Sequence, residues 1–203
     1  MKRGFTLIEM LVAIGIIAVL IAAISGSYAG ITKAAQRTRC LELVSNTATA
    51  LTALYQETGV WPRALRQNGG GTDGELDEET ALPLAGYMSL AVSSDKTRLI
   101  GYDRFGIVSP WATAYIKSHG TKANVGSKIP GGGTLRDHIL HYAIDLDGDG
   151  IIRGASVGGE AIDVRATAIV WCCGRDGKIE AYSTGMRKDD VHSWSVGQTV
   201  DVR

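Results

Sequence analysis

An acidic loop at residues 145–156 has the spacing of carboxylates that binds calcium. Aspartates stand at its first, third and fifth positions, Asp145, Asp147 and Asp149, and a glycine occupies the sixth. Carboxylates at alternate positions converge on one cation, and the glycine permits a sharp turn. The twelfth position is Ser156, where an EF-hand needs a bidentate glutamate, so the loop is not an EF-hand. A hairpin turn with solvated carboxylates stands beside calcium binding as the alternative.

The other reactive side chains form no catalytic pattern. There is no His-Glu-x-x-His, and nothing in the sequence places a serine, a histidine and an aspartate together, so the sequence predicts that the protein is not an enzyme. His138 and His141 lack a third ligand nearby and are expected on the surface of a sheet. The three cysteines, Cys40, Cys172 and Cys173, are expected to be small buried thiols on a helix and a strand. A disulfide to Cys40 in an oxidising compartment stays open.

The amino terminus combines two cations with a long apolar stretch. Lys2 and Arg3 precede residues 5–24, whose single charge is Glu9. As a helix with a rise of ~1.5 Å per residue, this stretch spans roughly 30 Å, the thickness of a bilayer core. The cations place its start in the cytoplasm. An intramembrane carboxylate costs about 3 kcal/mol and is therefore a functional candidate, although Glu9 lies only one turn past Phe5 and the headgroups are within its reach. An ordinary secretory signal peptide is the competing interpretation, but its apolar core is shorter, about 7–15 residues.

The string Gly4-Phe5-Thr6-Leu7-Ile8-Glu9 resembles the class III signal of type IV pilins and type II secretion pseudopilins. In that family a prepilin peptidase cuts after the glycine, and the new terminal phenylalanine is N-methylated. The resemblance implies cleavage after Gly4 and methylation of Phe5. It also implies that Glu9 neutralises the terminal amine of a neighbouring subunit during assembly, because a buried charge pair is tolerated better than a lone buried charge.

The carboxy-terminal loop resembles, in part, the calcium loop of major pseudopilins. Taken alone, the segments 174–177 and 188–194 are an ordinary turn and an acidic pair. Matched to the family, Asp176 and Asp190 are the implied structural calcium ligands. The helpers implied by the same match are Asp189 and Ser193. The insert at residues 178–187 departs from the family pattern, but the resemblance still ranks this loop above the Asp145 loop for calcium.

One long helix is predicted to contain both the apolar stretch and an amphipathic stretch after it. Small and apolar residues recur every three to four positions from Ile31 to Tyr55, and no proline occurs between residues 5 and 58. Gly59 and the Trp61-Pro62 pair end the helix. Residues 67–80 are expected to be a solvated acidic loop, residues 81–118 short apolar pieces and turns, and residues 118–133 another loop. Antiparallel strands are expected at residues 138–144 and 164–171.

Composition supports one anchor and one modest domain. The chain has 203 residues, is 45% hydrophobic and carries 21 basic and 21 acidic residues, with no basic stripe, so no nucleic-acid partner is expected. The predicted fold class is α+β, a pilin-like long N-terminal helix packed on a small antiparallel sheet with long loops. The predicted parts are a leader at residues 1–4, a transmembrane and assembly helix at 5–26, an amphipathic spine at 27–58 and a globular periplasmic head at 59–203.

The family resemblance predicts a structural fibre subunit of a type II secretion pseudopilus. It implies polymerisation with copies of the same chain, and partners in the prepilin peptidase, the inner-membrane assembly platform and the minor pseudopilins. The location implied is the bacterial inner membrane, as a single-pass protein with a periplasmic head and a periplasmic fibre. A type IV pilin of a surface or DNA-uptake pilus is the first alternative. A membrane-tethered calcium-binding domain that does not polymerise is the second.

Overall fold

A computed structural model describes most of the chain. It covers the backbone of residues 6–183, 190–194 and 199–202, and the side chains of the same residues apart from 23–29 and 199–202. The chain divides into two compact units, Met1–Gln36 and Arg37–Arg203.

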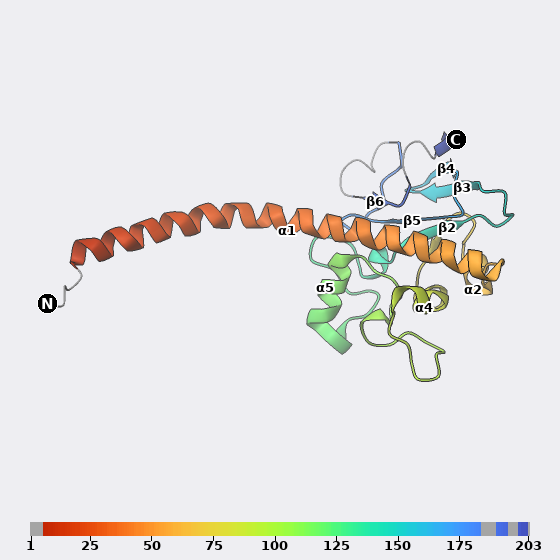
Figure 1. Cartoon of the computed structure of the whole chain (residues 1–203), viewed down its shortest axis with the longest axis horizontal. Coiled ribbons are helices and arrows are strands. Elements are labelled where there is room, and N and C mark those ends of the chain that lie inside the picture. The colour runs from red at the N-terminus through yellow and green to blue at the C-terminus, as the bar shows by residue number, and fades with distance from the viewer. Residues whose placement is uncertain (1–5, 184–189, 195–198, 203) are drawn as a thin grey trace. The chain divides into compact units, whose positions relative to one another are not determined.

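Helix α1 (Leu7–Thr58) is one element of 52 residues, as the absence of proline predicts. It ends where the sequence indicates. Gly59 adopts a φ of +69°, which favours glycine, and its amide donates to the Tyr55 carbonyl oxygen at 2.8 Å. The red-to-orange ribbon in Figure 1 is this helix.

The first turns of α1 expose their apolar side chains. Eleven large hydrophobic residues between positions 7 and 21 are each more than half exposed: Leu7, Ile8, Met10, Leu11, Val12, Ile14, Ile16, Ile17, Val19, Leu20 and Ile21. Among the residues whose side chains the structure describes, no helix has an apolar stretch that is long enough to span a membrane. The predicted span, 5–26, also includes residues outside that description.

The part of α1 within the second unit is amphipathic, as its spacing predicts. Cys40, Val44, Thr47, Leu51 and Leu54 are all buried and recur every three to four residues along one face. In Figure 1 this part of α1 lies between the short helices and the strands. The apolar residues of this buried face belong to the main hydrophobic core.

The strands form two antiparallel sheets, whereas a single small sheet was predicted. One sheet has the order β1-β2-β5-β6 and the other β3-β4-β7. Their bounds are β1 (Gly74–Glu75), β2 (His141–Ile144), β3 (Ile152–Val157), β4 (Glu160–Val164), β5 (Ala168–Cys172), β6 (Val191–His192) and β7 (Thr199–Val202).

Strand β5 separates two hydrophobic cores. Ala168, Val170 and Cys172 belong to the core that includes the buried face of α1. Ile169 and Trp171 belong to a second core, which contains residues of β3 and β4. Because successive side chains of a strand point to opposite faces, the four-stranded sheet is covered by α1 on one face and by the three-stranded sheet on the other.

Apart from α2, the short helices lie between β1 and β2 in the sequence. They are α2 (Arg63–Gln67), α3 (Glu78–Ala81), α4 (Ala85–Met88) and α5 (Pro110–His119), with 3-10 turns η1 (Leu82–Leu84), η2 (Gly101–Asp103), η3 (Gly120–Lys122) and η4 (Arg136–His138). Helix α5 was not predicted. Its start carries a local signal all the same, because Ser109 caps the amide of Ala112 and Pro110 follows at the first helical position.

Two other expectations need correction. The run 164–171 is not one strand, because Val164 ends β4 and β5 begins at Ala168. The acidic stretch 67–80 is also more ordered than a solvated loop: it contains β1, and the Asp77 carboxylate accepts the amides of Glu79 and Thr80 to cap α3.

Candidate functional site

The loop between β2 and β3 brings three carboxylates together. Asp145, Asp147 and Asp149 each offer a carboxylate oxygen, and these oxygens lie within 4.8 Å of one another. It is the one such group of three or more acidic, histidine or cysteine side chains within the described residues. Strands β2 and β3 belong to different sheets, so the alternative of a hairpin turn is wrong.

Backbone contacts fix Asp145 at the base of this loop. Its carboxylate is buried and accepts the amides of Gly148 at 2.8 Å and Gly150 at 2.7 Å. Its carbonyl oxygen accepts the indole N–H of Trp61 at 2.6 Å, and Trp61 stacks on Tyr55 near the end of α1. The end of the helix therefore holds the loop in position.

Arg153 balances the charge of the exposed carboxylates. Its guanidinium donates to Asp149 and lies 3.4 Å from an oxygen of Asp147. The hydrogen bond from Arg153 lowers the pKa of Asp149 and, reciprocally, raises the pKa of Arg153. A calcium ion in this loop would have to compete with that guanidinium for two of the three carboxylates.

Of the residues predicted to bind calcium in the carboxy-terminal loop, Asp176, Asp190 and Ser193 are described, and each accepts a hydrogen bond from a backbone amide. Asp190 is buried, and its two carboxylate oxygens accept the amides of Gly174 at 2.7 Å and Glu180 at 2.8 Å. Asp176 accepts the amide of Lys178 at 3.0 Å, and Ser193 accepts the amide of Val170 at 2.9 Å. The bonds of Asp190 hold loop backbone beside the start of β6, the bond of Ser193 reaches β5, and the bond of Asp176 is local to its turn. Asp189 lies outside the described residues, so the complete predicted set is not described.

His138 is buried, contrary to the prediction of a surface position. Its Nδ1 lies 2.9 Å from the Ser109 hydroxyl and 3.3 Å from the Cys173 sulfur, and its Nε2 lies 3.1 Å from the Gly132 carbonyl oxygen. Because Nε2 faces an acceptor, the neutral ring carries its proton there and Nδ1 accepts. The Cys173 thiol donates to the Asp137 carbonyl oxygen at 3.0 Å. The cluster thus has its hydrogen bonds satisfied inside the fold.

That cluster contains a serine, a histidine and a cysteine, but its burial argues against nucleophilic chemistry. Burial lowers the pKa of His138 and raises the pKa of the Cys173 thiol, so both groups are held neutral. A reactive cysteine needs an accessible thiolate. The arrangement fits a structural role. His141 does lie nearer the surface, where its Nδ1 is 2.6 Å from the Asp73 carboxylate.

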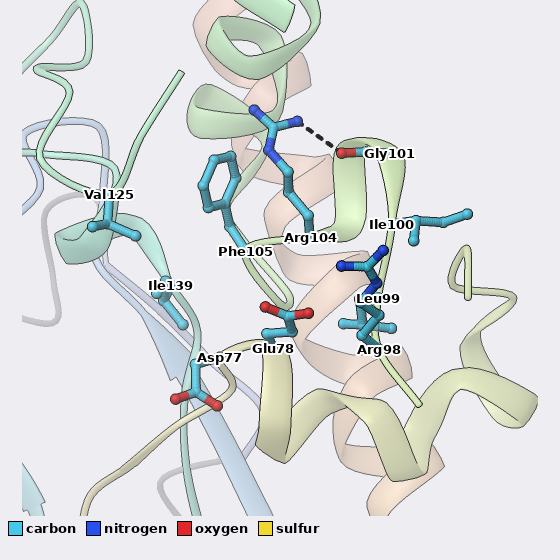
Figure 2. Close-up of a pocket in the computed structure, with 10 residues that line it drawn as sticks. All are labelled: Asp77, Glu78, Arg98, Leu99, Ile100, Gly101, Arg104, Phe105, Val125 and Ile139. Carbon is cyan, nitrogen blue, oxygen red and sulfur yellow. Dashed lines mark hydrogen bonds between the residues drawn. The ribbon is translucent and has the colours of Figure 1, made fainter. Parts of the chain in front are cut away.

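A surface cavity of about 620 Å³ lies elsewhere on the second unit. Figure 2 shows the Glu78 carboxylate between Arg98 on one side and Phe105 on the other, with the Arg104 guanidinium donating to the Gly101 carbonyl oxygen at 2.8 Å. Arg104 also lies over the Phe105 ring, 4.2 Å from its centroid. Among the described residues, the charged groups that line it are the carboxylates of Asp77 and Glu78 and the guanidinium groups of Arg98 and Arg104.

At the amino terminus the structure gives Glu9 a local role. Its carboxylate accepts the Thr6 amide and the Thr6 hydroxyl, both at 2.8 Å, and the Thr6 hydroxyl lies 3.3 Å from the Glu9 amide. This is a capping box, and its signal, Thr-x-x-Glu, is present in the sequence. Gly4 and Phe5 lie outside the described residues.

Comparison with known proteins identifies this terminus. Residues 1–25 match the model of the prokaryotic N-terminal methylation motif. The chain carries the signal of type IV pilins. A stretch of 63 residues, 31% of this chain, is 33% identical to the type IV major pilin protein PilE of Neisseria gonorrhoeae and spans 38% of that protein. No solved structure matches the chain. The motif, the pilin similarity and the fold class together support the pilin and pseudopilin family.

Proposed function

We propose that this protein is a structural fibre subunit of a type II secretion pseudopilus. The supporting observation is the start of α1, where eleven large apolar side chains are exposed within the matched methylation motif. Exposed apolar surface on this scale needs another apolar environment. A bilayer supplies it before assembly and a bundle of identical helices supplies it in the fibre.

The proposed processing prepares the helix for that bundle. Cleavage after Gly4 by a prepilin peptidase removes Lys2 and Arg3, and methylation modifies the new amine of Phe5. Glu9 then pairs with the Phe5 amine of a neighbouring subunit and sets its register, since an unpaired carboxylate among apolar helices is costly. In the monomer, Thr6 satisfies the same carboxylate, so assembly exchanges one partner for another.

The proposed location and partners follow from this cycle. The subunit inserts in the bacterial inner membrane with its head in the periplasm, and it meets the assembly platform and minor pseudopilins there. A type IV pilus is the second candidate, favoured by the similarity to a type IV major pilin. The two differ in where the fibre accumulates, since a pilus extends from the cell surface and a pseudopilus stays in the periplasm.

The first test is the mature amino terminus, measured by intact mass and terminal-peptide sequencing of the full chain from membranes. We expect a chain that starts at methylated Phe5. A chain that starts near Ser25, or that still starts at Met1, contradicts the proposal.

Assembly is tested separately with Glu9→Gln, which keeps the size of the side chain and removes its charge. We expect normal insertion and cleavage but at least a tenfold loss of subunit from the sedimented fibre fraction. Glu42→Gln is the matched control, because Glu42 is an exposed acid further along the same helix. If Glu9→Gln assembles like the control, Glu9 does not set the register of the fibre. If the wild type itself is absent from the fibre fraction, the protein is better explained as a tethered domain that does not polymerise.

We also propose a structural calcium ion in the head. The Asp145 loop is favoured by the convergence of its carboxylates, and the carboxy-terminal loop with Asp176 and Asp190 by its resemblance to the family. Isothermal titration of the full chain in detergent with calcium chloride separates them. Asp147→Asn abolishes binding only in the first case and Asp176→Asn only in the second. Arg153→Gln strengthens binding only in the first case, because it removes the competing cation.

A further inference from the structure

Two of the three cysteines lie in the same hydrophobic core although they come from distant parts of the sequence. Cys40 lies on α1 and Cys172 is the last residue of β5, and both are fully buried. Both belong to the core that joins the helix to the four-stranded sheet. The influence of Cys40 on its neighbour is consistent with this proximity, because the Cys40 thiol and burial raise the pKa of Cys172.

The alternation of strand β5 distinguishes Cys172 from its neighbour. Even-numbered residues of β5 face the core that contains α1, and odd-numbered residues face the second core. Cys172 therefore faces the core that contains Cys40. The next residue, Cys173, is engaged elsewhere, by the Asp137 carbonyl oxygen at 3.0 Å and by His138 at 3.3 Å.

We propose that Cys40 and Cys172 are the disulfide pair of this protein and that Cys173 stays a free thiol. The bond would fasten α1 to β5, an inner strand of the four-stranded sheet. It would close a loop of roughly 130 residues, and cross-links over long loops restrict the unfolded chain most. In the cell, the inference rests on the proposed function in one respect, namely that the head faces an oxidising compartment.

The reaction is thiol–disulfide exchange with a disulfide-bearing oxidant. A thiolate from one cysteine attacks the oxidant and forms a mixed disulfide, and the second thiolate displaces the oxidant's remaining thiol. Two protons and two electrons leave the pair, the S–S bond of the oxidant breaks, and the Cys40–Cys172 bond forms. The Cys40 thiol and burial both raise the pKa of Cys172, so exchange in the folded head is slow. Oxidation belongs to folding, before the core closes.

Competing pairings have structural costs. Neighbouring cysteines such as Cys172 and Cys173 point to opposite faces of an extended backbone, so joining them would require the end of β5 to rearrange. A Cys40–Cys173 bond would break the contacts of Cys173 with Asp137 and His138. It would also leave Cys172 as the free thiol facing the helix.

The test uses the full chain in detergent, unfolded, reduced and refolded in a buffer of reduced and oxidised glutathione. Free thiols are then alkylated in denaturant, and the linkage is read by intact mass and peptide mapping. We expect the chain to lose two hydrogen atoms, one thiol to be alkylated, and that thiol to be Cys173. Cys173→Ala keeps the bond, whereas Cys40→Ala and Cys172→Ala lose it. Reduction should lower the melting temperature of the wild-type head by roughly 10 °C and leave the melting temperature of Cys40→Ala unchanged.

A Cys172–Cys173 or Cys40–Cys173 bond, or three alkylated thiols, overturns the proposal. This test needs no export, so its failure is separate from failure of the proposed function. In chains taken from cells, one mass spectrum reports on both proposals. Methylated Phe5 indicates processing, and the loss of two hydrogen atoms indicates the disulfide.

Discussion

The Asp190 carboxylate offers the sharpest test of how the carboxy-terminal loop is held. It is only 2% exposed, and its two oxygens accept two backbone amides, of Gly174 and Glu180. The substitution Asp190→Asn preserves the shape of the side chain. It turns one acceptor oxygen into an N–H donor, which then faces a backbone N–H.

The expected cost is set by those two bonds. A hydrogen bond to a charged group contributes about 1.5–3 kcal/mol, and a buried amide left without an acceptor costs about 1–3 kcal/mol. Of the bonds to Gly174 and Glu180, Asp190→Asn loses one and makes the other neutral, so we expect a loss of about 2–4 kcal/mol. For a head of this size, that corresponds to a fall in melting temperature of roughly 5–15 °C.

The assay is thermal unfolding of the full chain in detergent, followed by near-ultraviolet circular dichroism, with and without a calcium chelator. Asp176→Asn is the control, because its single bond, to the Lys178 amide, survives on the amide oxygen. We expect the control to stay within about 0.5 kcal/mol of wild type. The reasoning is refuted if Asp190→Asn has the same melting temperature as the wild type. If the chelator lowers the wild-type melting temperature and both variants abolish that response, calcium holds the loop.

Acid and core substitutions test the rest of the head. Burial lowers the pKa of His138 and of His192 below the ordinary value of about 6.5. The stability that depends on these neutral rings is therefore fully present above that pH and is lost as the pH falls through the lowered pKa values. His138→Gln should flatten the decline in urea midpoint between pH 7.5 and pH 5, and an unchanged slope would contradict this. Leu51→Ala should cost about 2–5 kcal/mol because Leu51 is fully buried on α1. Leu41→Ala, at a 47% exposed position, should stay within about 0.5 kcal/mol in the same urea titration, and equal losses would contradict the assigned helix face.

The elements with strong local signals were predicted well. Helix α1 has the 3.6-residue period, no proline and a terminal glycine, and each of these acts within a few residues. Helix α5 had local signals too, a capping serine and a following proline, but ten residues with a partial apolar face are easily read as turns. The burial of His138 had no local signal. It depends on Ser109, Gly132 and Cys173, which come from three separate segments that meet only in the folded head.

The second sheet was not predicted because β5 is buried on both faces. All five of its residues are buried, so the strand has no polar alternation to indicate which face is the core. A fully apolar run predicts that something covers both faces, and α1 is one cover. The other face is covered by β3 and β4, whose buried residues form the second core with Ile169 and Trp171. The break between β4 and β5 follows from the same requirement. A single straight strand over residues 164–171 would belong to one sheet, whereas ending β4 at Val164 lets the chain leave the three-stranded sheet and enter the four-stranded sheet as an inner strand. Because side chains alternate along β5 between these two covers, Cys172 faces the core that contains α1 and Trp171, one residue earlier, faces the second core.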